Sequence, residues 1–216
     1  MKEFISKYKH AWCLLYAFIY LPWFVFLEKN VLHYSIIHIR LDDYIPFNEY
    51  FIIPYFLWFA YVAIAIMFFF FTNKEDYYKL CAFLFIGMTI SLIICTIWPN
   101  GHNLRPTEFA RENIFTDMVR GLWATDTPTN IFPSIHVYNS IGVHLAVMNS
   151  EALKKKRVVR IISFALMASI CLSTVFLKQH SALDGIGAIV MSMFMYRMVY
   201  HTERVANREK LEGQFN

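Results

Sequence analysis

Residues 50–72 read YFIIPYFLWFAYVAIAIMFFFFT, a run of 23 residues without a single charged side chain. A helix of about 20 apolar residues is long enough to cross the hydrocarbon core of a bilayer. Five other apolar stretches approach this length. We therefore predict an all-α fold, in which residues 1–216 form a single integral membrane domain built as a bundle of six transmembrane helices. The predicted spans are about 11–27, 50–72, 79–98, 132–149, 158–177 and 182–200.

The composition supports this class and excludes others. Of the 216 residues, 57% are hydrophobic and only 17% are charged, and a soluble domain of this size has too little interior to hide so many apolar side chains. The net charge of +4 does not indicate a nucleic-acid partner, because the basic residues punctuate the apolar runs instead of gathering on one face. The expected partners are the lipid bilayer and a membrane lipid.

The distribution of lysine and arginine predicts how the chain is oriented. Six of the 20 basic residues fall on one side of the predicted spans, and the other fourteen fall on the opposite side. The side richer in basic residues faces the cytoplasm. Both termini are then cytoplasmic, and residues 28–49, 99–131 and 178–181 lie outside. We take a bacterial plasma membrane as the expected location.

Two short segments carry residues suited to chemistry. The first is Phe132-Pro133-Ser134-Ile135-His136, and the second runs from Ser173 through His180 to Asp184. Each contains a histidine at the outer end of an apolar helix. His180 and Asp184 are four residues apart, so on a helix they share a face, and the carboxylate can fix the tautomer of the imidazole.

These histidines are suited to phosphoester cleavage. The free nitrogen of His180 can attack phosphorus and form a phosphohistidine, while His136 donates a proton to the leaving alkoxide. Arg105 and Lys178 are candidates to bind the phosphate, together with Ser134 and the free amides at the start of its helix. This arrangement requires no metal and no cofactor, and the chain lacks the clustered carboxylates that would hold magnesium.

The same residues resemble the motifs of a known family. Pro133-Ser134-Ile135-His136 is similar to the P-S-G-H motif of the type 2 phosphatidic acid phosphatase superfamily, and Ser173, His180 and Asp184 match its S-R-x5-H-x3-D motif in spacing. Arg105-Pro106 resembles the end of its K-x6-R-P motif. The resemblance implies a membrane enzyme acting on lipid phosphates, with His180 as nucleophile, Asp184 as its orienting partner and His136 as the acid.

Three positions depart from the family pattern. Trp98 stands where the family has lysine, Ile135 where it has glycine, and Thr174 where it has arginine. Two phosphate-binding cations are therefore missing. Lys178 is the candidate replacement for one, and Arg111 or Arg120 for the other.

Three functions are compatible with these residues. The expected one is a metal-independent lipid phosphatase that hydrolyses phosphatidic acid, phosphatidylglycerol phosphate or a polyprenyl diphosphate. The second is transfer of a phospho-group to an alcohol, because the altered cation set also resembles the inositol phosphorylceramide and sphingomyelin synthases. The third is a non-catalytic membrane protein that binds lipid head groups. The choice of lipid and the oligomeric state stay open.

Overall fold

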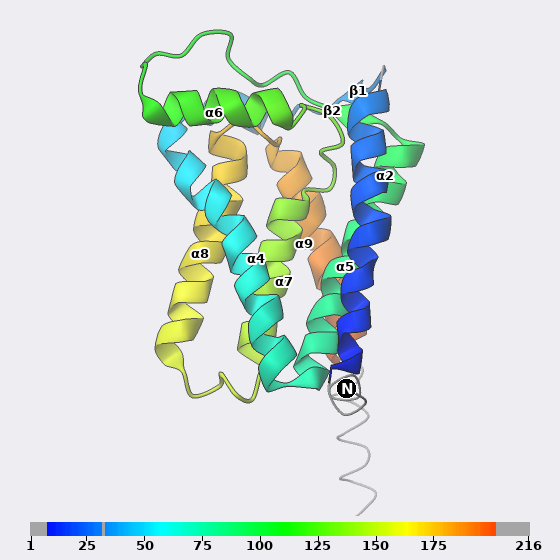
Figure 1. The fold of residues 1–216 in the computed structure, drawn as a ribbon. Coiled ribbons are helices and arrows are strands. Elements are labelled where there is room, and N and C mark those ends of the chain that lie inside the picture. Colours follow the sequence, from blue (N-terminus) through cyan, green and yellow to red (C-terminus); the bar gives the residue numbers. More distant parts are fainter. Residues whose placement is uncertain (1–7, 32, 202–216) are drawn as a thin grey trace, which may run out of the picture.

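The computed structural model describes residues 8–31 and 33–201, and the regular secondary structure in this part of the chain is almost entirely helical (Figure 1). Within it, five helical segments are long and apolar enough to cross a membrane. The all-α class is therefore confirmed, and the protein is one embedded in a membrane. The five segments are Lys9–Asn30, Glu49–Thr72, Lys74–Ile97, Arg157–Phe176 and Ala182–Tyr200.

Several of these segments combine two kinds of helix. The first joins the 3-10 helix η1 (Lys9–Tyr16) to α2 (Ala17–Asn30), and the second joins η2 (Glu49–Phe51) to α4 (Ile52–Thr72). The third and fourth are α5 (Lys74–Ile97) and α8 (Arg157–Phe176). The last is α9 (Ala182–Tyr196), which continues as the π-helix η3 (Arg197–His201).

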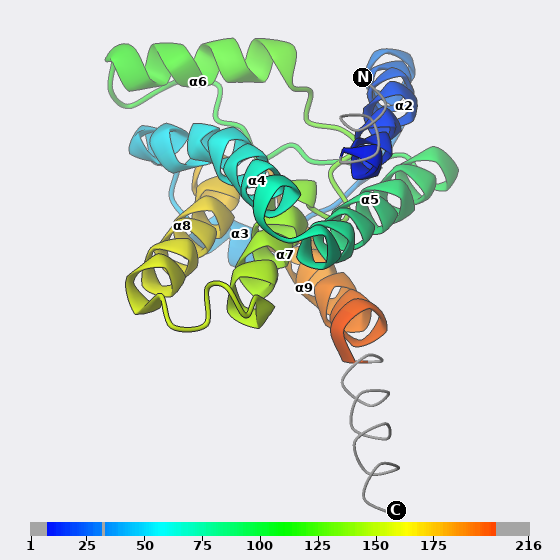
Figure 2. The same ribbon diagram turned by 60° about the horizontal axis from the view of Figure 1, so that its bottom comes forward.

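The predicted span 132–149 differs from the others. Its helix, α7 (Ile135–Asn149), has only 15 residues, which corresponds to about 22 Å and is less than the roughly 30 Å of a hydrocarbon core. The helix begins late because the Ser134 side chain accepts a hydrogen bond from the Val137 amide and so caps it. A bundle of six spanning helices is thus not established by length, although α7 packs against α4, α5, α8 and α9 (Figure 2).

Close packing at the centre depends on glycine. A Cβ atom at Gly87 of α5 would collide with the Tyr138 ring of α7, and one at Gly142 of α7 would collide with the Phe83 ring of α5. Small residues let helices in a bilayer approach one another closely. The two glycines therefore allow α5 and α7 to pack with the large rings between them.

Most of the remaining structure lies at one end of the bundle (Figure 1). Strand β1 (Ser35–Ile36) pairs in parallel with β2 (Asn100–Gly101), and α3 (Arg40–Tyr44) follows β1. The predicted loop 99–131 also contains α6 (Ile114–Thr125), which lies across the end of the bundle. This helix was not predicted from the sequence.

Side chains of other segments hold the end of the 99–131 loop in place. The Asn100 side-chain oxygen accepts hydrogen bonds from the amides of Ile131 and Phe132 at 3.0 and 2.9 Å. At the end of α2, the Glu28 carboxylate accepts bonds from the Thr127 hydroxyl at 2.5 Å and the Asn130 amide group at 3.0 Å. These contacts fix the chain just before the first histidine motif.

The start of η1 and the end of α9 lie at the same end of the bundle, opposite α6 (Figures 1 and 2). This agrees with an orientation in which both ends of the helical part face one side. The prediction of that side also used Lys2, Lys7, Arg204, Arg208 and Lys210, which lie outside the described residues.

Candidate active site

The fold brings the two predicted histidines together. His136 lies in the first turn of α7, and His180 lies in the turn between α8 and α9. Their ring centroids are 5.7 Å apart and their planes are inclined by 60°. Both side chains are largely buried, with 9% and 7% of their residue surface exposed. A group held between them would contact both imidazoles.

The position of His180 depends on how α8 ends. Lys178 adopts a φ of 53°, in the left-handed region that reverses the chain after a helix. The amides of Gln179 and His180 then both donate to the Thr174 carbonyl at 3.0 Å. This tight turn directs the His180 imidazole towards the start of α7.

Asp184 lies beside His180, as the four-residue spacing predicts. One carboxylate oxygen accepts a hydrogen bond from the Ser181 amide at 2.8 Å and lies 3.3 Å from Nδ1 of His180. The other oxygen is buried and has no hydrogen-bond partner among the described residues. Because Nδ1 faces the carboxylate, Nε2 is the nitrogen that can face a substrate. The catalytic roles of these two residues remain predictions.

A second aspartate fixes the start of α9. Asp42 of α3 accepts a hydrogen bond from the Ser181 hydroxyl at 2.6 Å and another from the Ala182 amide at 2.7 Å. These amide and hydroxyl groups would otherwise be left unsatisfied at a buried helix end. Asp42 therefore positions the helix that carries Asp184. Its only marker in the sequence is an acidic pair, Asp42 and Asp43, in the 28–49 segment.

His136 is held between two aromatic side chains of α4. The ring centroid of Tyr55 lies 4.6 Å from that of His136, and the ring centroid of Trp58 lies 4.4 Å from it. Nδ1 of His136 is buried and has no hydrogen-bond partner among the described residues. The aromatic contacts fix the ring plane but do not satisfy that nitrogen.

Of the predicted phosphate-binding cations, Arg105 is the one that contacts a neighbour of the histidine pair. Its guanidinium donates to the Gln179 side-chain oxygen at 2.6 Å, and to the backbone carbonyls of Asp126 at 2.7 Å and Trp123 at 3.2 Å. Its Nε is buried and is not hydrogen-bonded to any described residue. Because Gln179 directly precedes His180, Arg105 brings a fixed positive charge to the edge of the histidine pair.

A polar network that was not predicted from the sequence lies next to Arg105. The Gln179 amide group donates to the Asp126 carboxylate at 2.8 Å, and the Tyr55 hydroxyl donates to the same oxygen at 3.1 Å. Burial, followed by the nearby negative charge of Glu28, raises the pKa of Asp126 to about 6. The only sequence signal was the polar stretch 125–130, which does not by itself indicate these partners.

The other predicted phosphate ligands make different contacts. Lys178 donates to the carbonyls of Asp42 at 2.9 Å and Ile45 at 2.6 Å. Ser134 is fully buried, and its hydroxyl caps α7. Arg120 is exposed on α6 and pairs with Glu112 and Asp117, while Arg111 lies 3.3 Å from Glu49. The fold thus brings together His136, His180, Asp184 and Arg105, and gives the remaining cations other partners.

Lys178 is therefore expected to stabilise the fold. Lys178→Met would leave two backbone carbonyls without their donor, which should lower the free energy of unfolding by about 1–3 kcal/mol. Thermal unfolding in detergent measures the change, with Lys74→Met as the matched substitution at an exposed lysine. If the variant has normal stability but a large loss of turnover, the result would instead support a role of Lys178 in binding the phosphate.

Two buried imidazoles at the site favour the neutral form. Burial lowers the pKa of His180 to about 3; a backbone hydrogen bond with Ile131 opposes this shift, and the charge of Arg105 adds to it. Burial, then the proximity of His180 and Arg105, also lowers the pKa of His102 to about 3. His102 donates from Nε2 to the Gln179 carbonyl at 3.0 Å and accepts from the Leu104 amide at Nδ1. A neutral His180 is the form that a nucleophile requires.

These low pKa values predict a loss of stability in acid. Below pH 6.5 the unfolded chain binds protons that the folded histidines reject, so stability falls as the pH drops towards 3. Between pH 6.5 and pH 5, one such histidine lowers the free energy of unfolding by up to about 2 kcal/mol, and His102→Gln should remove this contribution. Asp126, whose pKa is raised, acts in the opposite direction, so the quantity to measure is the difference between wild type and variant. An equal pH dependence of unfolding in both would contradict the assignment.

These contacts define a class of site: a buried His-His-Asp cluster, with one guanidinium at its edge, at one end of a membrane-embedded helical bundle. Among the described residues, no group of three or more His, Cys, Asp or Glu side chains is placed to hold a metal ion. Comparison of the chain with protein-family models, with curated proteins and with solved structures gives no match.

Proposed function

We propose that this protein is a membrane enzyme that cleaves a phosphoester of a lipid through a phosphohistidine at His180. The observation that carries the proposal is the 5.7 Å separation of the His136 and His180 rings, with Asp184 at Nδ1 of His180. Nucleophile, orienting carboxylate and proton donor are the three groups that this chemistry needs. The motif resemblance to the type 2 phosphatidic acid phosphatases supports the same assignment.

The reaction proceeds in two steps. Nε2 of His180 forms a bond to phosphorus as the bond from phosphorus to the lipid alcohol oxygen breaks, and His136 gives that oxygen a proton. Water then attacks phosphorus, His136 accepts a proton from it, and the bond from phosphorus to Nε2 breaks to release phosphate. Asp184 holds the His180 tautomer throughout, and Arg105 stabilises charge on the phosphoryl oxygens. No metal takes part in these steps.

The membrane arrangement is part of the proposal. We take α7 as a sixth helix that passes through the bundle, so that α2, α4, α5, α7, α8 and α9 alternate in direction. The excess of basic residues at the end opposite α6 then favours an active site at the extracytoplasmic face of a bacterial plasma membrane. The substrates that fit this location are phosphatidic acid, phosphatidylglycerol phosphate and polyprenyl diphosphates.

Transfer of the phospho-group to an alcohol is the second candidate function. The specific observation that favours it is burial, because Asp184 is fully enclosed and both histidines are nearly so. A site that limits water while admitting a second lipid directs the phosphohistidine to an alcohol. The intermediate is the same in both reactions, and only the acceptor differs.

One assay separates these functions. Purified protein in detergent with chelator is given a panel of lipid phosphates, with and without an added diacylglycerol or ceramide as acceptor, and His180→Ala is tested in parallel. Phosphate released from lipid alone, and lost in the variant, is the result expected of the phosphatase. Product that forms only when the acceptor is present supports the transferase, and lipid binding with no turnover under any condition would overturn both.

A further inference from the structure

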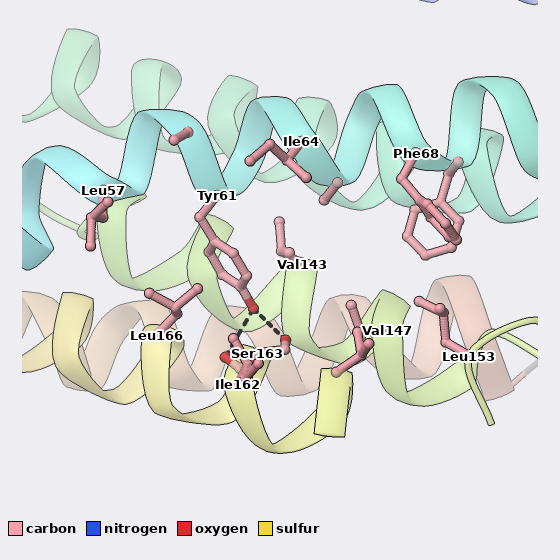
Figure 3. Close-up of a pocket in the computed structure, with 14 residues that line it drawn as sticks. Leu57, Tyr61, Ile64, Phe68, Val143, Val147, Leu153, Ile162, Ser163 and Leu166 are labelled. Carbon is pink, nitrogen blue, oxygen red and sulfur yellow. Dashed lines mark hydrogen bonds between the residues drawn. The ribbon is translucent and has the colours of Figure 1, made fainter. Parts of the chain in front are cut away.

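An apolar cavity of about 380 Å³ lies between α4, α7 and α8 (Figure 3). Its walls are aliphatic and aromatic side chains, and the hydroxyl of Tyr61 is engaged in hydrogen bonds to the Ser163 hydroxyl at 2.6 Å and carbonyl at 3.1 Å. The lining therefore offers a ligand hydrocarbon contacts and almost no polar ones. Among the lining residues are Leu57, Ile64, Phe68, Val143, Val147 and Leu166.

The cavity is long and opens sideways. Along α4 it extends from Leu57 to Phe69, a rise of twelve residues or about 18 Å of helix. Ile64 of α4 and Ile162 of α8 line it and are also exposed, at 67% and 54% of their surface. Because these side chains face lipid in a membrane-embedded bundle, a hydrocarbon chain can enter from the bilayer without crossing water.

One end of the cavity adjoins the candidate active site. Leu57, at that end, directly precedes Trp58, whose ring lies 4.4 Å from that of His136. The opposite end is bounded by Phe68 and Phe69 of α4 and by Leu153, which follows α7. Trp58 and His136 do not line the cavity, but Val143 does, and it lies two turns after His136 on the same face of α7. A lipid whose phosphate is held at the histidines would therefore pass Trp58 before its chain runs along α4, away from the site.

We propose that this cavity binds one hydrocarbon chain of the lipid substrate while its phosphate is held at His180. The inference rests on the proposed function, and it explains how the protein would select its substrate by the length of the hydrocarbon chain. A water molecule occupies about 30 Å³ in the liquid, and a methylene group is of similar size. The cavity volume of about 380 Å³ therefore holds about a dozen methylene groups. Long-chain lipid phosphates should therefore be cleaved in preference to short-chain esters, because each buried methylene adds binding free energy.

Filling the cavity tests this selectivity. Ala65 of α4 lines the cavity and is buried, so Ala65→Phe should occupy the middle of the chain path. We expect kcat/KM for a 16-carbon phosphate monoester to fall at least about tenfold, while that for a 4-carbon ester is unchanged. Ala63→Phe is the matched control, because Ala63 is exposed on the same helix and is not among the lining residues. Ala60→Phe, at the open side of the cavity, is the second filling variant if Ala65→Phe fails to fold.

Photolabelling provides a readout that needs no turnover. A lipid phosphate with a diazirine at the end of its chain should label peptides containing Phe68 or Leu153 in wild type and in Ala63→Phe, but not in Ala65→Phe. Label spread over the outer helix faces and equal in all variants would overturn the chain site. Label in the cavity without turnover of any ester would support the chain site and overturn the proposed function, so the two failures can be distinguished.

Discussion

His180→Ala is expected to abolish the phosphoenzyme and to lower kcat/KM for lipid phosphates by at least about 10³-fold. The variant keeps His136 and Arg105, but it has no nitrogen at the position from which phosphorus is attacked. Rapid quenching after addition of a lipid labelled in its phosphate group measures the acid-labile protein-bound phosphate, and product release is followed in the same samples. Wild type should show both signals, and the variant neither.

The matched control is His33→Ala, since His33 is exposed and lies outside the cluster. Its phosphoenzyme and turnover should equal those of wild type. Thermal unfolding of each variant separates loss of chemistry from loss of fold, because removing a buried imidazole also leaves a cavity. Retention of turnover by a folded His180→Ala protein would exclude His180 as nucleophile.

Asp184→Asn should have the second largest effect, a loss of kcat of roughly 10²- to 10⁴-fold. The amide oxygen can still accept the Ser181 amide hydrogen bond, so the start of α9 is preserved. The oxygen that accepts this bond also faces Nδ1 of His180, so the substitution removes the ionisable carboxyl there and the stabilisation of the positive charge that develops on the imidazole when Nε2 attacks phosphorus. Single-turnover measurement of the phosphorylation step should show the loss directly.

Asp43→Asn is the matched control for the carboxylate. Asp43 also bonds a histidine, His38, at 2.7 Å, but that pair is exposed and lies in the 28–49 segment. Its replacement should leave kcat and KM unchanged. If Asp184→Asn turns over at the wild-type rate, Asp184 serves only to cap α9 and does not orient His180.

The helical class and the contact between His180 and Asp184 could be predicted from the sequence for a simple reason. Apolar runs about 20 residues long and a four-residue spacing are local properties, which depend on few other parts of the chain. The two residues do not share a helix as predicted, however: His180 precedes α9, and the turn that caps this helix brings it to Asp184. The proximity of His136 to His180 was harder to predict, because the sequence indicated only that both residues lie at the same side of the membrane. The fold supplies the packing of α7 between α4, α8 and α9 that brings the two rings together.

The surroundings of the cluster could not be predicted in the same way. Lys178 binds the 42–45 segment because its backbone takes a left-handed conformation, which is uncommon for lysine and has no marker in the sequence. The bonds of Gln179 to Arg105 and Asp126 join residues more than 50 positions apart. Such contacts follow from how helices pack and how α6 lies over them, and residue spacing carries no information about either.

The contacts of Asp42 also constrain the order in which the protein can mature. Synthesis delivers Asp42 and the 42–45 carbonyls early, but their partners in residues 178–182 emerge only near the end of the chain. Until the last two helices dock, the Asp42 carboxylate has the Ile39 amide but lacks its donors at Ser181 and Ala182, and His180 is not yet in place. If the proposed function holds, a half-inserted chain is consequently inert toward the lipids around it, and turnover requires residues 42–45 to meet the turn between α8 and α9.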